Sequence, residues 1–442
     1  MKNRSLRYLF WILVFITLCS VAFGSFGILY GEASANPALS PVKTGGFNGL
    51  ASAAIDGKWG FINAKGEWAI RPAFEAVGDF AADGLARAKN NEKWGFINSR
   101  GKWIIPPDLG EVEAFAADGL ARAESNGKWG FINSKGKWVI RPDFEAVKDF
   151  AASGLALALS NDERWGFINV RGEWAIPPEI DEVWNFAPGG LVGARIDMKW
   201  GYINDAGEWV IPPAFDAVEN FAPDGLARAE GNGKWGFINV KGEWVIPPAF
   251  DLVWDFAAGG LARVRSGWKW GFIDTRGEWA IPPAFDQVED FDANGLALAL
   301  NHQYGFINAK GEWVIPPAFD YIMSGFAADG LARANSNGKW GFINTKGEWV
   351  IQPDYDGVWD FAADGLAQAL SQSNGKWGFI NAKGEWVIQP AFDLVGDFAA
   401  GGLARALSQS NGKWGFINAK GKWAIQPAFD LVGDFASVGP AK

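Results

Sequence analysis

Histidine and cysteine are almost absent from this chain of 442 residues, which has one of each. The cysteine, Cys19, lies in an apolar N-terminal stretch, so the rest of the chain has no thiol and only His302 as an imidazole. A cysteine nucleophile, a Ser-His-Asp triad away from His302 and a zinc site of ordinary His/Cys composition are therefore excluded. Because no disulfide can form after the N-terminal stretch, we expect packing alone to stabilise the fold.

Clusters of positive charge are also scarce. Lys and Arg number 40 against 50 Asp and Glu, which gives a net charge of −10 and a pI near 4.9. Phosphate-backbone binding needs clustered Lys and Arg, whereas here they are spread one or two per repeat among more numerous acids. We expect no nucleic-acid partner, and contact with a membrane only through the N-terminal segment.

Tryptophan, in contrast, is abundant and periodic. Most of the 26 Trp fall in two columns nine residues apart that recur in eleven copies, at steps of 34 to 37 residues. A fixed period of this size marks a repeat array. We assign the two columns to the structural core of the repeats, and the representative members are Trp59, Trp68, Trp94, Trp103, Trp129, Trp138, Trp235, Trp244, Trp340 and Trp349.

Turn residues divide each copy into short strands, as the sixth copy illustrates. Asn232-Gly233 is a strong signal for a tight hairpin turn, and the stretch 239–242 fits a longer hairpin loop that ends in Gly242. We expect Pro247-Pro248 to stop the third strand, because proline cannot donate to a ladder. The following apolar residues at a spacing of three predict a packed connector. The predicted fold is all-β, with eleven repeats of about 35 residues, each a three-stranded meander.

The arrangement of the copies has two alternatives. We expect no strand to be left over at either end to complete a shared sheet, and propellers typically have four to eight blades of four strands. We therefore favour an open, twisted solenoid over one or two propeller-like rings. Either way, one copy cannot bury its own apolar surface, so neighbours must stack.

The N-terminus differs in composition from the repeats. Lys2, Arg4 and Arg7 precede an uncharged run from Leu9 to Tyr30, and Ala33-Ser34-Ala35 resembles a signal-peptidase site. Residues 1–35 thus predict a cleaved signal peptide or an uncleaved membrane-anchoring helix, and both place the repeats outside the cytoplasm. The domain boundaries follow as a spacer at 36–46, repeats at 47–438 and a tail at 439–442.

Carboxylates are numerous but repeat from copy to copy, as in the connector pair Asp251 and Asp255. A glycosidase needs one acid pair with distinct environments, and nothing singles out one pair here. We expect these acids to bind turn amides, with weak calcium binding and catalysis as the lesser alternatives. We expect His302 to be a solvated turn residue. The sequence predicts no catalytic residue, no metal and no cofactor.

Four tryptophans of the array lie outside the two columns: Trp184, Trp254, Trp268 and Trp359. Three of them follow the connector Val, in a slot where other copies have Gly, Lys or Glu, which indicates an exposed position. Exposed aromatic residues stack on sugars or anchor protein partners. We take these four as candidate contact residues, with lateral packing between repeats as the alternative.

The recurring Lys-Trp-Gly-Phe-Ile-Asn, Lys-Gly-Glu-Trp-Val-Ile-Pro-Pro and Asp-Gly-Leu-Ala segments resemble the bacterial WG (KWG) repeat over residues 47 to about 438. The resemblance implies short β-rich repeats in bacterial, often exported proteins that have no established common activity. The hypothesis is a non-enzymatic envelope scaffold that presents an aromatic, acidic surface to a protein partner. Binding of cell-wall or other envelope polysaccharide through exposed Trp is the alternative.

Overall fold

A computed structural model describes residues 49–435, except 82, 152, 185–189, 205–206, 258 and 400. The predicted signal peptide or anchor, the spacer and the tail therefore lie outside the described residues. The described residues belong to one compact unit, Thr44–Lys442. Among them, no helix is long and apolar enough to cross a membrane.

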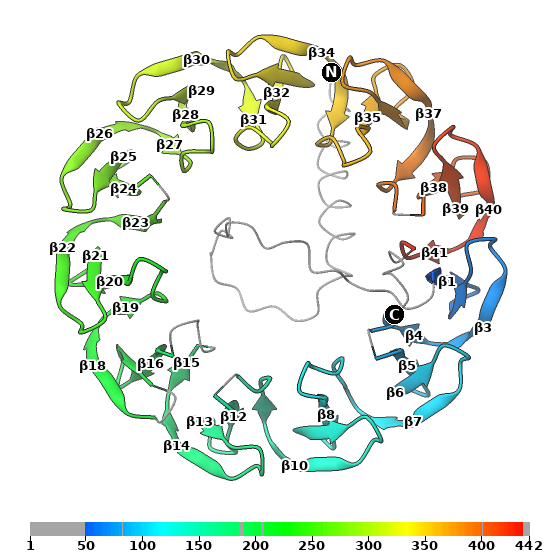
Figure 1. Cartoon of the computed structure of the whole chain (residues 1–442), viewed down its shortest axis with the longest axis horizontal. Helices are drawn as coiled ribbons and strands as arrows, with labels where there is room; N and C mark the ends of the chain where they lie inside the picture. Colours follow the sequence, from blue (N-terminus) through cyan, green and yellow to red (C-terminus); the bar gives the residue numbers. More distant parts are fainter. Residues whose placement is uncertain are drawn as a thin grey trace, which may run out of the picture. The chain divides into compact units, whose positions relative to one another are not determined.

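The described chain is all-β, and each repeat contributes three antiparallel strands, as expected (Figure 1). The first strands are β1 (Ala51–Ile55), β5 (Leu85–Asn90), β8 (Leu120–Ser125), β12 (Ala156–Leu159), β16 (Val192–Ile196), β20 (Leu226–Gly231), β24 (Leu261–Ser266), β28 (Ala297–Asn301), β32 (Leu331–Ser336), β35 (Ala367–Ser371) and β38 (Leu403–Ser408). The second strands are β2 (Lys58–Ile62), β6 (Lys93–Asn98), β9 (Lys128–Asn133), β13 (Trp165–Ile168), β17 (Lys199–Ile203), β21 (Lys234–Asn239), β25 (Lys269–Asp274), β29 (Gln303–Ile307), β33 (Lys339–Asn344), β36 (Trp377–Ile380) and β39 (Trp414–Asn418). The third strands are β3 (Trp68–Phe74), β7 (Trp103–Leu109), β10 (Trp138–Phe144), β14 (Trp174–Ile180), β18 (Trp209–Phe215), β22 (Trp244–Phe250), β26 (Trp279–Phe285), β30 (Trp313–Phe319), β34 (Trp349–Val358), β37 (Trp386–Val395) and β40 (Trp423–Phe429).

The connector is not only a packed link, as expected from the sequence, because it adds a fourth strand to the next repeat. In a typical sheet the order is β19-β20-β21-β22, and β19 comes from the preceding repeat. These connector strands are β4 (Ala76–Val77), β11 (Ala146–Val147), β15 (Glu182–Val183), β19 (Ala217–Val218), β23 (Leu252–Phe256), β27 (Gln287–Val288), β31 (Tyr321–Ile322) and β41 (Leu431–Val432). Elsewhere Val112 forms a single bridge to Ala123, and β34 and β37 run on into the connector.

The expectation that no strand is left over at the ends is wrong, because the last connector strand pairs with the first repeat. In β41, Val432 lies opposite Ala53 and Leu431 opposite Ala54. This register matches that of Val218 opposite Ala229 inside the array. Repeat 11 (red) accordingly lies beside repeat 1 (blue) in Figure 1. Two-residue strands are too short to stand out in the sequence, so the ends looked unpaired.

The Pro pair does not stop the third strand, which was also wrongly expected. Strand β22 runs through Pro247 and Pro248 as far as Phe250, and its pairing with β21 is interrupted by register shifts. It is the terminal strand of its sheet, with no partner on its other side. Proline is tolerated on such an edge, where a missing N–H costs no ladder bond and discourages pairing with another chain.

The interior of most repeats is built by Phe and Ile rather than by the paired indoles, and repeat 5, where Trp200 and Tyr202 are buried, is the exception. Phe237 and Ile238 are almost fully buried, whereas Trp235 is half-buried and Trp244 is 36% exposed. The sheet is covered by neighbours on both faces, which buries consecutive residues of the second strand and leaves the larger indoles at the margin. The ten representative Trp pack beside these clusters instead of filling them.

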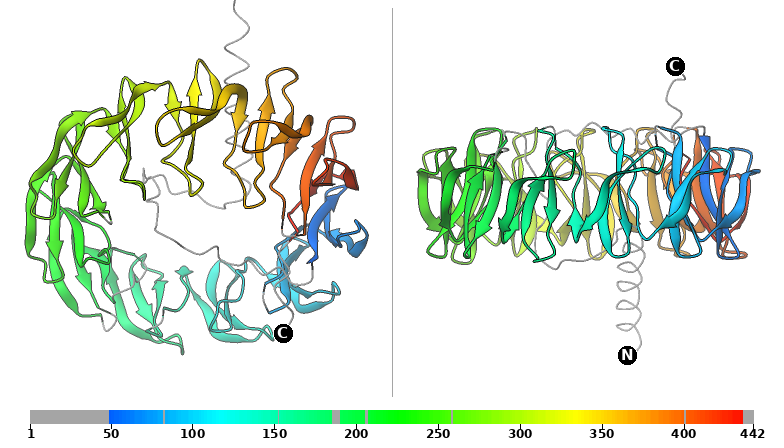
Figure 2. Two further views of the ribbon diagram at one scale, coloured as in Figure 1. Left: turned by 45° about the horizontal axis from the view of Figure 1, so that its top comes forward. Right: turned by 90° about the horizontal axis from the view of Figure 1, so that it is seen from below.

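Neighbouring repeats contact each other through the second Trp and through the hairpin loop, which joins the second and third strands. Trp103 packs edge-on against Phe74 of the preceding repeat, with ring centroids 5.5 Å apart. A Cβ on the loop residue Gly101, whose φ is +73°, would lie 2.7 Å from Ile70 of that repeat. Both contacts recur between repeats 11 and 1, as Trp68 against Phe429 and Gly66 against Ile425. The strands run between the two faces of the array (Figure 2), so all hairpin loops lie on one face and all hairpin turns on the other.

Candidate functional site

In seven repeats the carboxylate that opens the connector accepts a hydrogen bond from the hairpin turn of the next repeat. Asp251 accepts hydrogen bonds from the Lys234 ammonium of its own repeat at 2.5 Å and from the Gly267 N–H of the next hairpin turn at 2.7 Å. These two bonds lower the pKa of Asp251, and equivalent bonds lower the pKa of Asp216, Asp286 and Asp430. The expectation that the connector acids bind turn amides is confirmed for Asp216, Asp251, Asp286 and Asp430, whereas the second acid of each pair, such as Asp255, binds a side chain instead. These acids therefore have a structural task in joining neighbouring repeats.

A second set of charges joins the first strand to the following connector. Arg228 donates to the Val253 carbonyl at 3.1 Å and to the Asp255 carboxylate at 2.8 Å. Burial raises the pKa of Glu219 beside this pair, and the Arg228 charge opposes that shift. Where the first-strand position is apolar or Gly, as at Leu157, Gly193 and Leu298, the connector acid is also replaced, by Asn185, Asn220 and Gly325. Both positions change in these three repeats, whereas repeat 2 keeps Arg87 although Ala114 replaces the acid, and Arg87 pairs with Glu113 instead.

The three tryptophans that follow the connector Val lie against this Arg position. The Trp254 ring lies between two guanidinium groups, 5.3 Å from that of Arg228 and 5.0 Å from that of Arg263. Trp359 lies 5.7 Å from the Arg333 guanidinium and is 41% exposed. Stacking of cations on an indole face contributes roughly 0.5–2 kcal/mol per contact. These two indoles are thus at least partly engaged between repeats.

Trp184 is engaged in a different way. Its ring stacks on Trp200 at 4.9 Å and lies over Gly193, where other repeats carry the Arg side chain. The missing guanidinium leaves room for the indole. The sequence grouped these three tryptophans correctly by their slot, but the structure shows partners that spacing alone does not reveal.

Trp268 is the most exposed of the four candidates. It occupies the hairpin turn between β24 and β25 beside Gly267, whose φ is +63°, and 90% of its surface is exposed. Met198 lies at the corresponding turn of repeat 5 and is 78% exposed. His302 also lies in an exposed hairpin turn and contacts Asn301. The hairpin turns therefore differ between repeats in chemistry, while the strands below them are nearly constant.

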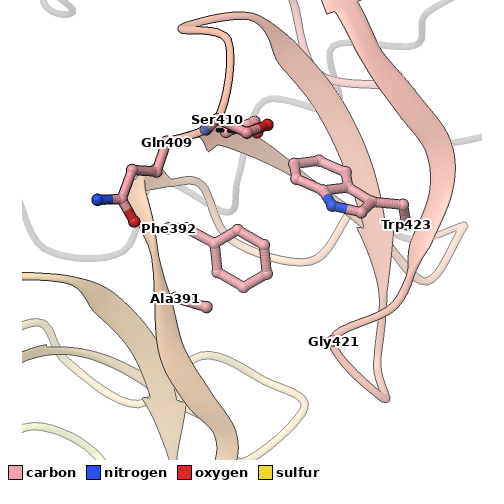
Figure 3. Close-up of a pocket in the computed structure, with 7 residues that line it drawn as sticks. Ala391, Phe392, Gln409, Ser410, Gly421 and Trp423 are labelled. Carbon is pink, nitrogen blue, oxygen red and sulfur yellow. Dashed lines mark hydrogen bonds between the residues drawn. The ribbon is translucent and has the colours of Figure 1, made fainter.

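A groove with a volume of about 390 Å³ lies between repeats 10 and 11, a feature not predicted from the sequence (Figure 3). Its aromatic walls are Phe392 and Trp423, and its polar rim is formed by Ser408, Gln409 and Ser410. The two extra turn residues of this repeat supply that rim, so the length change was the available signal. At the corresponding position between repeats 9 and 10, Tyr355 donates to the Gly384 carbonyl, whereas Phe392 has no hydroxyl.

Within the described ranges, no group of three or more His, Cys, Asp or Glu side chains is arranged to hold a metal ion. The side chains of the sites described above offer indole faces, amides, hydroxyls and paired charges. Such surfaces bind ligands or partners by stacking and hydrogen bonding.

Comparison with known proteins identifies the repeat but no activity. The sequence model for "WG containing repeat" matches residues 59–94, 94–129, 129–163, 165–200, 200–235, 235–269, 270–301, 304–340, 340–376, 377–413 and 414–439. No curated protein matches the sequence significantly.

Solved structures show only distant similarity. A eukaryotic initiation factor is similar with 10% identity and a TM-score of 0.39, over 77% of this chain and 95% of that one. The extracellular domain of a putative one-component system from B. thetaiotaomicron is similar with 10% identity and a TM-score of 0.25, over 86% and 70%. Hsv2p from Kluyveromyces lactis is similar with 10% identity and a TM-score of 0.28, over 61% and 96%. At these scores the similarities do not bear on function.

Proposed function

Because the chain belongs to the family of WG-containing repeat proteins, we propose that it is an exported, non-enzymatic scaffold that binds a protein partner at the cell envelope. Its eleven repeats would form a closed, propeller-like ring, as the pairing of β41 with β1 supports. Export is supported by the charge pattern and apolar run of residues 1–35. The absence of cysteine after Cys19 suits a repeat region that does not depend on its redox surroundings.

The observation that carries this proposal is a contrast between two parts of the repeat: the connector charges recur and are paired, whereas the hairpin turns vary from repeat to repeat. Connector carboxylates such as Asp251 and Asp255 are bound to Lys and Arg, so these recurring connector charges are paired within the array. The hairpin turns vary, and one of them presents Trp268 almost fully to solvent. Tryptophan is enriched among the residues that dominate protein interfaces, because it buries a large rigid area on binding.

Polysaccharide binding is the second candidate, and the groove of Figure 3 favours it. Phe392 and Trp423 offer aromatic walls, and Gln409 offers an amide at the rim. Aromatic faces combined with amide and hydroxyl groups suit the apolar faces and hydroxyls of a sugar ring.

Trp268→Ala is expected to abolish binding to the protein partner. It should change the free energy of unfolding by less than about 0.5 kcal/mol, because the exposed side chain contributes little to packing. The measurement places a photo-crosslinking amino acid at the neighbouring exposed position 266 in the producing cell, once with Trp268 kept and once with Trp268→Ala. The control site is Val170, which is 57% exposed in a hairpin loop of the other face. One discrete, protease-sensitive adduct at 266 that is lost with Trp268→Ala, and no adduct at 170, is the expected result. Equal labelling at 266 and 170, no protein adduct at 266, or an adduct that persists with Trp268→Ala would contradict a protein partner at this turn.

A further inference from the structure

The residue after the loop glycine differs in charge between repeats. Eight repeats have Glu there, and in seven of them the first Asn of the loop donates its side-chain N–H to that Glu, as Asn239 does to Glu243 at 2.9 Å. The other three repeats carry Lys102, Lys137 and Lys422. No salt bridge involves these three ammonium groups within the described part of the chain, and all three side chains are exposed.

Pairing of the two ends brings these three lysines into one run of loops. Gly66 of the first loop lies against Ile425 of repeat 11, and Gly101 and Gly136 lie against repeats 1 and 2 in the same way. Repeats 11, 1, 2 and 3 are therefore consecutive, although Lys102 and Lys422 are 320 positions apart in the sequence.

These four hairpin loops, which we call the basic arc, are strongly positive. They carry one carboxylate, Glu67, against seven cations, namely Lys65, Arg100, Lys102, Lys135, Lys137, Lys420 and Lys422. The other seven loops carry six cations against nine carboxylates. A basic arc on a chain of net charge −10 is a local feature that the overall composition conceals.

We propose that the basic arc binds an acidic polysaccharide, one whose sugars carry carboxylate or phosphate groups. Four adjacent loops place their cations in a row, which fits a polymer with charges at intervals. At the repeat 11 end, Gly421 and Trp423, which flank Lys422, also line the groove with Gln409 on its rim. The arc thus combines ammonium groups for the anionic substituents with an aromatic and amide groove for a sugar ring.

The neighbouring repeats argue against a broad, flat anionic surface as the occupant. The hairpin loops of repeats 4 and 5, residues 169–173 and 204–208, carry three carboxylates against one cation, Arg171. A membrane covering the whole face would meet these acids as well, at a Coulombic cost. A flexible chain can follow the arc and end before repeat 4.

The test replaces the three lysines by the residue that eight repeats already carry at this position. The variant is Lys102→Glu/Lys137→Glu/Lys422→Glu in the full chain. The matched control is Lys241→Glu/Lys310→Glu/Lys346→Glu, which changes the net charge equally in three hairpin loops outside the arc. Because Glu is tolerated after the loop glycine elsewhere, the arc variant should fold, and its urea-unfolding midpoint verifies this. The probe is fluorescently labelled alginate, a polymer of uronic acids, at several salt concentrations.

The arc variant should bind alginate more than tenfold more weakly than the parent chain, while the control variant should change affinity less than threefold. Binding by the parent should weaken with salt, and the arc variant should show a smaller salt dependence. Gln409→Ala should weaken the binding of alginate but leave the binding of polyphosphate unchanged, because polyphosphate is charged but contains no sugar. Equal losses in the arc and control variants, no alginate binding by the parent, or tighter binding to polyphosphate or anionic vesicles than to alginate would each overturn the proposal. The proposed protein partner at Trp268 is tested separately and is unaffected by these outcomes.

Discussion

Gly236→Ala is expected to destabilise the protein by on the order of 3 kcal/mol, a large effect for the addition of one methyl group. Gly236 is the glycine of the Trp-Gly pair in repeat 6, and a Cβ there would lie 2.3 Å from the Ile246 carbonyl oxygen. It would also lie 2.8 Å from the Pro247 carbonyl carbon. Because both neighbours are backbone atoms, β21 and β22 would have to separate, and a change of rotamer cannot relieve the clash.

The matched control is Gly259→Ala, because a Cβ at that position has no neighbour within 4 Å. Its expected effect is less than about 1 kcal/mol in either direction. The measurement compares the midpoints of urea unfolding of the two variants with that of the parent. Similar midpoints for both would show that the close approach at Gly236 is not required, and the Trp-Gly signature would then lack a steric cause.

Trp68→Ala and Trp103→Ala are expected to destabilise the protein equally, by roughly 2–3 kcal/mol each, because each removes a half-buried aromatic side chain. Trp103 packs on the core of repeat 1 beside Phe74. Trp68 packs on the core of repeat 11 beside Phe429, with nearly the same geometry. In an open array Trp68 would have no preceding repeat to contact, so its truncation would cost far less than that of Trp103.

Urea unfolding of both variants distinguishes these cases. Trp268→Ala serves as the reference, because it gives the change in the free energy of unfolding when an exposed indole is removed. If Trp68→Ala lowered the free energy of unfolding only as much as Trp268→Ala does, while Trp103→Ala lowered it by roughly the expected 2–3 kcal/mol, the two ends of the array would be free. Equal losses would support contact between repeats 11 and 1.

Local chemistry made the repeat predictable from the sequence. Asn232-Gly233 marked the hairpin turn, and both residues adopt the positive φ that this turn requires. The period placed the strands, and the first connector acids, such as Asp216 and Asp251, were correctly assigned to turn amides. Each of these features depends on residues within about one repeat, where sequence spacing reports spatial proximity.

The sequence did not reveal what depends on contacts between repeats. Strand β19 has two residues, which is too short for an alternating pattern, so the fourth strand was missed. Pro247 and Pro248 looked like a strand end because the edge position of β22 was unknown. Whether β41 meets β1 depends on the twist accumulated over eleven repeats, which no local pattern encodes.

In the candidate site, too, features within one repeat were predictable from the sequence, and contacts between repeats were not. Trp254 and Trp359 were selected from their shared slot, but their stacking on Arg228 and Arg333 required the structure. The basic arc was missed because net charge and per-repeat averages conceal a run that crosses from repeat 11 to repeat 1. The available signal was the replacement of Glu by Lys102, Lys137 and Lys422.

The pairing of the first and last repeats is tested most directly by a disulfide between positions 52 and 433. A Cβ on Gly433 would lie 3.8 Å from the Ser52 Cβ, and the Gly433 N–H donates to the Ser52 carbonyl at 2.8 Å. Cβ atoms in disulfides are typically about 3.5–4.5 Å apart. The variant is Ser52→Cys/Gly433→Cys with Cys19→Ser, so that no other thiol is present.

The measurement is mild oxidation of the dilute, folded monomer, followed by non-reducing electrophoresis and mass spectrometry of the linked peptides. We predict near-complete intramolecular linkage of positions 52 and 433, with faster migration than the reduced chain, and no linkage in a Ser52→Cys single variant. Two free thiols that persist in the folded monomer, or linkage only between molecules, would contradict the pairing of β41 with β1.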